Sequence, residues 1–74
     1  MPKSASGKNA IKILTKEFGF FVVSQKGSHV KLKKTLSHGD IITIVPMHRE
    51  LARGTLRGVV ELAQIDFKDF KRFL

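Results

Sequence analysis

Apolar residues recur at helical spacing near the start of the chain. They stand at i, i+3 and i+7, as Ile11, Leu14 and Phe18. This period predicts an amphipathic helix that ends at Phe18, with Ser6 or Gly7 as its N-cap and Gly19 as its stop. The short lead before it, residues 1–5, is small and polar, and we expect it to be frayed.

The middle of the chain is typical of β-strands. The predicted strands are residues 20–25, 28–34 and 41–45. Lys26-Gly27 is expected to form a tight turn, "TLSHGD" a turn-forming loop, and Pro46 the end of the third strand. Because short connections force neighbouring strands to pair, the pattern predicts a three-stranded antiparallel meander.

The second predicted strand has two unlike faces. Strand side chains repeat every two residues, so Val30 and Leu32 point one way. His29, Lys31 and Lys33 point the other way. The histidine is therefore expected to lie on a charged face.

Helical spacing returns after the third strand. Thr55 can cap a helix whose apolar stripe is Leu56, Val59, Val60 and Ala63. Asp66 can cap a last short helix, which carries Phe67, Phe70 and Leu74. The order α-β-β-β-α, plus a short C-terminal helix, indicates an α+β fold of two layers, with the helices on one face of the sheet.

Length and composition narrow the function classes. At 74 residues, the chain is expected to be one small domain, 1–74, without a deep substrate cavity. The lack of cysteine excludes disulfides and thiolate sites. No apolar run approaches the roughly 18 residues of a bilayer span, and the first residues do not resemble a signal peptide, so we expect a cytoplasmic protein with no membrane partner.

Charge indicates the kind of partner. The chain has 14 basic and 6 acidic residues, a formal net charge of +8. A polyanion is the expected ligand, because neutralised phosphates release counterions, and nucleic acid ranks above a membrane. An acidic protein partner and charge that serves solubility are the alternatives.

His29 is the main candidate for chemistry. An imidazole can take up and return a proton near neutral pH, and the lysines beside it could hold a phosphate. An exposed strand histidine without a catalytic role fits the same pattern. His48 could share acid and base roles with His29, or be a loop residue or a substrate contact, and His38 is expected to be a surface residue.

The remaining polar groups favour anion binding over metal binding. The histidines and carboxylates form no pattern of metal ligands, so we expect chemistry without a metal or other cofactor. Arg49, Arg53 and Arg57 surround the predicted start of the second helix, where a phosphate could dock. Solvated arginines beside an ordinary helix start are the other interpretation.

Together, several motifs resemble the HicA-type mRNA interferase toxins (YcfA-like family). The motifs are "SGKNAIKIL" before a "GF" break, "QKGSHVKLKK", and "IVPMHRELARGTLRGVVELAQI" before a short terminal helix. The resemblance implies a double-stranded-RNA-binding-domain-like fold. It also implies that His29 is catalytic and that residues 25–28, Gln25, Lys26, Gly27 and Ser28, shape the turn presenting it. The second family signature spans His48 to Arg57, and the hairpin between Lys34 and Ile41 is a variable part.

The resulting hypothesis is a toxin endoribonuclease that cleaves mRNA without a metal ion. The resemblance implies inhibition by a HicB-type antitoxin covering the RNA face. The expected RNA-binding residues are Lys26, Gly27, Ser28, Lys31, Lys33, Lys34, His48, Arg53 and Arg57. The alternative is a non-catalytic RNA-binding module that uses the same basic sheet face.

Overall fold

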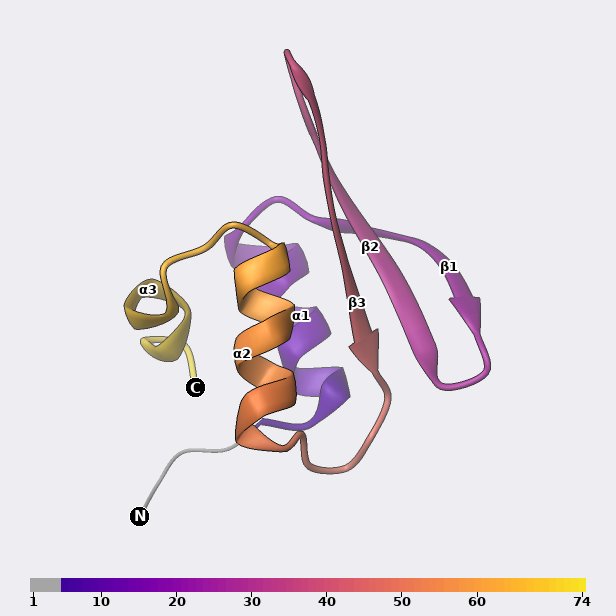
Figure 1. The fold of residues 1–74 in the computed structure, drawn as a ribbon, viewed down its shortest axis with the longest axis vertical. Helices are drawn as coiled ribbons and strands as arrows, with labels where there is room; N and C mark the ends of the chain where they lie inside the picture. The colour runs from indigo at the N-terminus through magenta and orange to yellow at the C-terminus, as the bar shows by residue number, and fades with distance from the viewer. Residues whose placement is uncertain (1–4) are drawn as a thin grey trace.

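The computed structural model describes residues 5–74 (Figure 1). Its elements are α1 (Gly7–Glu17), β1 (Phe21–Lys26), β2 (His29–Leu36), β3 (Gly39–Pro46), α2 (Arg53–Leu62) and α3 (Phe67–Lys71). The predicted order and the α+β class are confirmed. Residues 1–4 of the expected frayed lead lie outside the described residues.

The three strands form one antiparallel sheet in the order β1-β2-β3, and the helices pack against one of its faces (Figure 1). The core lies between these layers. Its most buried large side chains are Leu14 of α1, Leu32 and Val45 of the sheet, Val60 of α2 and Phe70 of α3. Within residues 5–74, no helix lies on the opposite face of the sheet, and the β2–β3 hairpin extends beyond the body of the molecule (Figure 1).

Two of the predicted helix caps are present. The Ser6 hydroxyl accepts a hydrogen bond from the Asn9 N–H at 2.9 Å, and Asp66 accepts one from the Lys68 N–H at 2.9 Å. Gly19 follows α1 with φ of +78°, a left-handed conformation that ends the helix. These three residues set both ends of α1 and the start of α3, and their types allowed these positions to be predicted from the sequence.

The start of α2 differs from the prediction. The helix begins at Arg53, with Ala52 in the capping position and no side-chain cap, so Thr55 lies within its first turn. The buried Leu51 fixes this entry, because its N–H donates to the Ala5 carbonyl at 2.8 Å. Tertiary contact, rather than a capping hydroxyl, sets where the helix starts.

Ala5 also corrects the expectation of a frayed lead. Only 3% of its surface is exposed, and its methyl group belongs to the core. Its hydrogen bond to Leu51 secures the backbone as well. Ala5, the last residue of the predicted lead, is therefore fixed by its packing and by its bond to the segment before α2.

Both hairpin turns are shifted or shorter than predicted. Lys26 pairs with His29, so the first turn consists of Gly27 and Ser28, with Gly27 at φ of +59°. Leu36 pairs with Gly39, which reduces the expected "TLSHGD" loop to a turn at residues 37–38. Cross-strand pairing extends the strands into residues that composition assigned to loops.

Two buried contacts hold the sheet on the helices. The Thr43 hydroxyl, fully buried in β3, donates to the Val59 carbonyl of α2 at 2.8 Å. Gly7 opens α1 where a Cβ atom would collide with the Pro46 carbonyl, and its N–H donates to the His48 carbonyl at 2.8 Å. The start of α1 therefore packs closely against the end of β3.

Candidate nucleic-acid interface

The uncovered sheet face carries three rows of side chains, one residue from each strand. Residues paired across neighbouring strands share a face, so the pairings define the rows. From β1 through β2 to β3, the rows are Phe21–Lys33–Ile42, Ser24–Lys31–Ile44 and Lys26–His29–Pro46. We call these nine residues the open face. His29, Lys31 and Lys33 occupy its central strand, as the two-residue period predicted, and Lys26 adds a further cation on β1.

A β-bulge in β1 determines which side chains the open face receives. The pairing shifts between Val22 and Ser24, and Val23 is the extra residue. Without the bulge, strict alternation would send Phe21 and Lys26 to opposite faces of the sheet. With it, both residues join His29 on the open face.

His29 is the first residue of β2 and is exposed. The turn before it is held on both sides. The Gln25 side-chain amide donates to the Gly27 carbonyl at 3.0 Å, and the Met47 N–H donates to the Ser28 carbonyl at 2.6 Å. The imidazole is thus attached to a fixed backbone at the edge of the molecule, with Lys26 directly across from it.

His48 lies at the same end of the molecule as His29. His29 pairs with Pro46, and Met47, the residue before His48, bonds to the turn beside His29. Both histidines are exposed, and no hydrogen bond joins their imidazoles within residues 5–74. The structure therefore brings the two segments together, and a shared catalytic role stays a prediction.

The two lysines of the central strand, Lys31 and Lys33, differ in whether their ammonium groups form an ion pair. The Lys33 ammonium forms an ion pair with the Asp40 carboxylate at 3.5 Å, while no ion pair is found for Lys31 among the described residues. Lys31 stands in the middle row, between Ser24 and Ile44. Lys31 is therefore the more available cation for a phosphate near His29.

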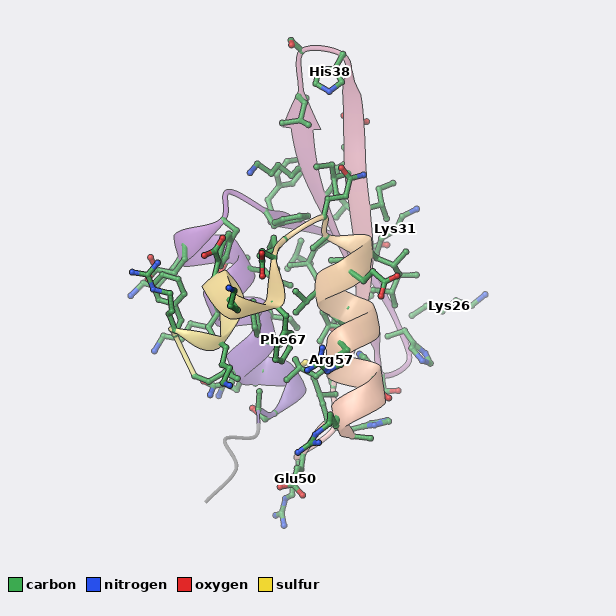
Figure 2. The ribbon with its side chains drawn as sticks, turned by 60° about the vertical axis from the view of Figure 1, so that its left-hand side comes forward. Lys26, Lys31, His38, Glu50, Arg57 and Phe67 are labelled. Atoms are coloured by element: carbon green, nitrogen blue, oxygen red, sulfur yellow. The ribbon has the colours of Figure 1, made fainter. Side chains whose placement is uncertain are left out.

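Some of the predicted RNA-binding residues lie away from the open face. Lys34 shares a face with the buried Leu32, and its ammonium sits 6.0 Å from the centre of the Phe20 ring. The Arg57 guanidinium lies 4.5 Å from the centre of the Phe67 ring, between α2 and α3 (Figure 2). Arg53 opens α2 and is exposed, and it lies outside the three strands of the open face.

The far end of the sheet holds the third histidine. His38 occupies the tip of the β2–β3 hairpin (Figure 2), well separated along β2 from His29. Among residues 5–74, no three His, Asp or Glu side chains are grouped so that they could hold a metal ion. Every helix in that range is also too short or too polar to span a bilayer.

Sequence reasoning missed the apolar part of the open face. Phe21, Ile42 and Ile44 are exposed there, on the two outer strands. For β3, the two-residue period separates Ile42 and Ile44 from Ile41, Thr43 and Val45, but the run of apolar residues does not say which set is buried; the structure buries the second set. For Phe21 no local signal existed, since its direction depends on the bulge.

Comparison with known proteins identifies the family. The family model described as "HicA toxin of bacterial toxin-antitoxin" matches residues 7–66, from the start of α1 to the cap of α3. The match covers most of the chain and includes the whole sheet, so the chain belongs to the HicA toxin family. A toxin of such a system has an antitoxin partner in general. Among curated proteins, none matches the chain at a significant level.

Proposed function

We propose that this protein is an endoribonuclease toxin, an mRNA interferase, that binds mRNA on the open face and cleaves it with His29 as the general base. HicA toxins are generally ribonucleases that cleave mRNA, which supports the class of reaction. The observation that carries the assignment to this face is the placement of an exposed histidine among lysines on an uncovered sheet. The charge of +8 supports a polyanionic substrate.

The proposed reaction uses the RNA's own 2′-hydroxyl as the nucleophile. His29 accepts the 2′-hydroxyl proton while the 2′-oxygen attacks the adjacent phosphorus, and the bond from phosphorus to the 5′-oxygen breaks. The leaving 5′-oxygen takes a proton, which the now protonated His29 can return. The products are a 2′,3′-cyclic phosphate and a 5′-hydroxyl. No metal ion takes part in this scheme.

The neighbours of His29 fit supporting roles. Lys31 would hold the phosphate and stabilise the negative charge that grows on it, a contribution of about 3 kcal/mol per donor in other enzymes. Lys26, directly opposite His29, would grip the backbone next to the scissile bond. Gly27 and Ser28 keep the imidazole in place through the turn rather than through direct chemistry.

An antitoxin would silence this enzyme by covering the open face. That face carries the proposed substrate contacts, and none of the described helices lies above it. We propose a HicB-type antitoxin as the partner. Co-purification of a HicB-type protein with this chain, and loss of cleavage in the complex, would test the pairing.

The decisive experiment uses an RNA oligonucleotide with one deoxy substitution on the 5′ side of a mapped cut. Cleavage at that bond should stop, while neighbouring cuts continue and the oligonucleotide still binds. Cleavage at an undiminished rate would require water as the nucleophile and overturn the scheme. A non-catalytic RNA-binding module, the rival function, predicts instead that excess RNA keeps its full length on a gel.

A further inference from the structure

Phe21 is an exposed aromatic ring on the open face. Its neighbour Phe20 is buried in the core, whereas 46% of Phe21 is exposed. The bulge in β1 aligns Phe21 with Lys33 and then Ile42, in the row farthest from His29. Bulges that re-aim a side chain are common beside functional sites.

The distribution of apolar and charged groups favours a nucleic acid over a protein as the ligand of this ring. Protein interfaces place apolar residues in the centre and polar ones at the rim, with lysine depleted from the core. The open face has the reverse order, because His29, Lys31 and Lys33 form its central strand, while the apolar Phe21, Ile42 and Ile44 lie on the outer strands, where Lys26 is the one lysine. A single-stranded RNA suits this order, since it offers phosphates for the lysines and flat bases for the ring.

We propose that Phe21 is a base-stacking subsite for single-stranded RNA, a few nucleotides from the phosphate held at His29. The proposal rests on the proposed function and adds how the substrate is positioned. His29 and Lys33 are four residues apart on β2, so the two outer rows are roughly 13 Å apart at about 3.3 Å per residue. Lys31, in the row between them, would contact the connecting backbone.

The test measures binding without cleavage. The probe is a single-stranded 2′-O-methyl oligonucleotide, which has no free 2′-hydroxyl, with one abasic site placed at each position in turn. The variants are Phe21→Leu, which stays apolar, and Phe73→Leu as a matched control. Phe73 is also 46% exposed, but it packs edge-on against Phe18 at 5.7 Å in the helical layer. Thermal unfolding verifies that both variants fold.

We expect one abasic position to weaken wild-type binding about tenfold, within the range for base–aromatic stacking. Phe21→Leu should bind the intact probe about tenfold more weakly and lose sensitivity to that abasic position. Phe73→Leu should bind the intact probe as wild type does and stay sensitive to the same abasic position. The losses of affinity caused by Phe21→Leu and by the abasic site would then not add, which would identify the ring and the base as partners.

Other outcomes separate the subsite from the proposed function. If wild-type protein binds the probe with a flat abasic profile, the subsite is wrong while the endoribonuclease proposal stands. If Phe21→Leu binds the intact probe as wild type does and keeps the abasic profile, the stacking proposal is overturned. Failure of wild-type protein to bind any probe would contradict both.

Discussion

At the scale of single residues, the proposed chemistry needs side chains that do little for the core. His29, Lys31 and Lys26 are all exposed on the sheet face opposite the helices. Substituting exposed residues usually changes the free energy of unfolding by less than about 0.5 kcal/mol. Loss of activity in such variants can therefore be separated from loss of the fold.

His29→Ala should abolish RNA cleavage and leave the unfolding temperature unchanged, because the imidazole is the proposed proton acceptor and contributes no core burial. The expected loss of kcat is at least about 100-fold, which is typical of removing a general base. His38→Ala, at the hairpin tip, is the matched control and should cleave normally. A folded His29→Ala variant that still cleaves well would move the catalytic role to His48.

Lys31→Gln should weaken RNA binding more than Lys33→Gln, since Lys33 already has the Asp40 carboxylate beside it. Removing that carboxylate provides the complementary test. Asp40→Asn frees Lys33 and should tighten binding severalfold, because the exposed ion pair contributes at most about 1 kcal/mol. Titration of a labelled 2′-O-methyl oligonucleotide measures all three variants. Equal losses for the two lysines would show that the ion pair does not matter.

At the scale of elements, close packing at one end of the molecule holds the His29 turn in place. The start of α1, the end of β3 and the segment before α2 meet through the hydrogen bonds of Gly7, Leu51 and Met47. Gly7 allows this approach because it has no side chain. The position of the turn thus depends on packing among segments far apart in the sequence.

Gly7→Ala should destabilise the fold by about 1–3 kcal/mol, the usual cost of overpacking, despite the higher helix propensity of alanine. The added Cβ would meet the Pro46 carbonyl, which is backbone and cannot rotate away. Gly58→Ala in α2 is the control, because a Cβ atom added there would have nothing within 4 Å. The free energy of unfolding of Gly58→Ala should be higher than that of wild type by about 0.5–1 kcal/mol. Urea unfolding measures both changes, and a stable Gly7→Ala protein would contradict the packing argument.

The elements themselves were largely predictable, because their periods are local. The alternation in 28–34 placed His29 and Lys31 on the open face correctly. The same period assigns Lys34 to the opposite face, with Leu32, although Lys34 was grouped with the RNA-binding residues. The bulge at Val23, the burial of Ala5 and the start of α2 were not predictable, since each depends on partners distant in sequence.

At the scale of the whole molecule, the positive charge is spread over both layers. The open face carries Lys26, Lys31 and Lys33, while α1 carries the exposed lysines Lys8, Lys12 and Lys16. The net charge of +8 therefore does not by itself say where RNA binds. If RNA binds only at the open face, then only the lysines of that face should release counterions when they contact phosphates.

Salt dependence can distinguish a defined site from general attraction by charge. Three open-face contacts predict that log K falls with log salt at a slope of about −2, at roughly −0.7 per phosphate for single strands. A variant with Gln at all three open-face lysines should bring this slope close to zero. A variant with Gln at the three α1 lysines removes the same charge and should keep the slope. The probe is again a 2′-O-methyl oligonucleotide. Single-stranded DNA should compete with it, because the lysines contact phosphates rather than sugars. DNA should not be cut, because it lacks the 2′-hydroxyl. If the salt-dependence slope fell equally in the two variants, RNA would bind over the whole charged surface. The open face would then not be a defined RNA-binding site.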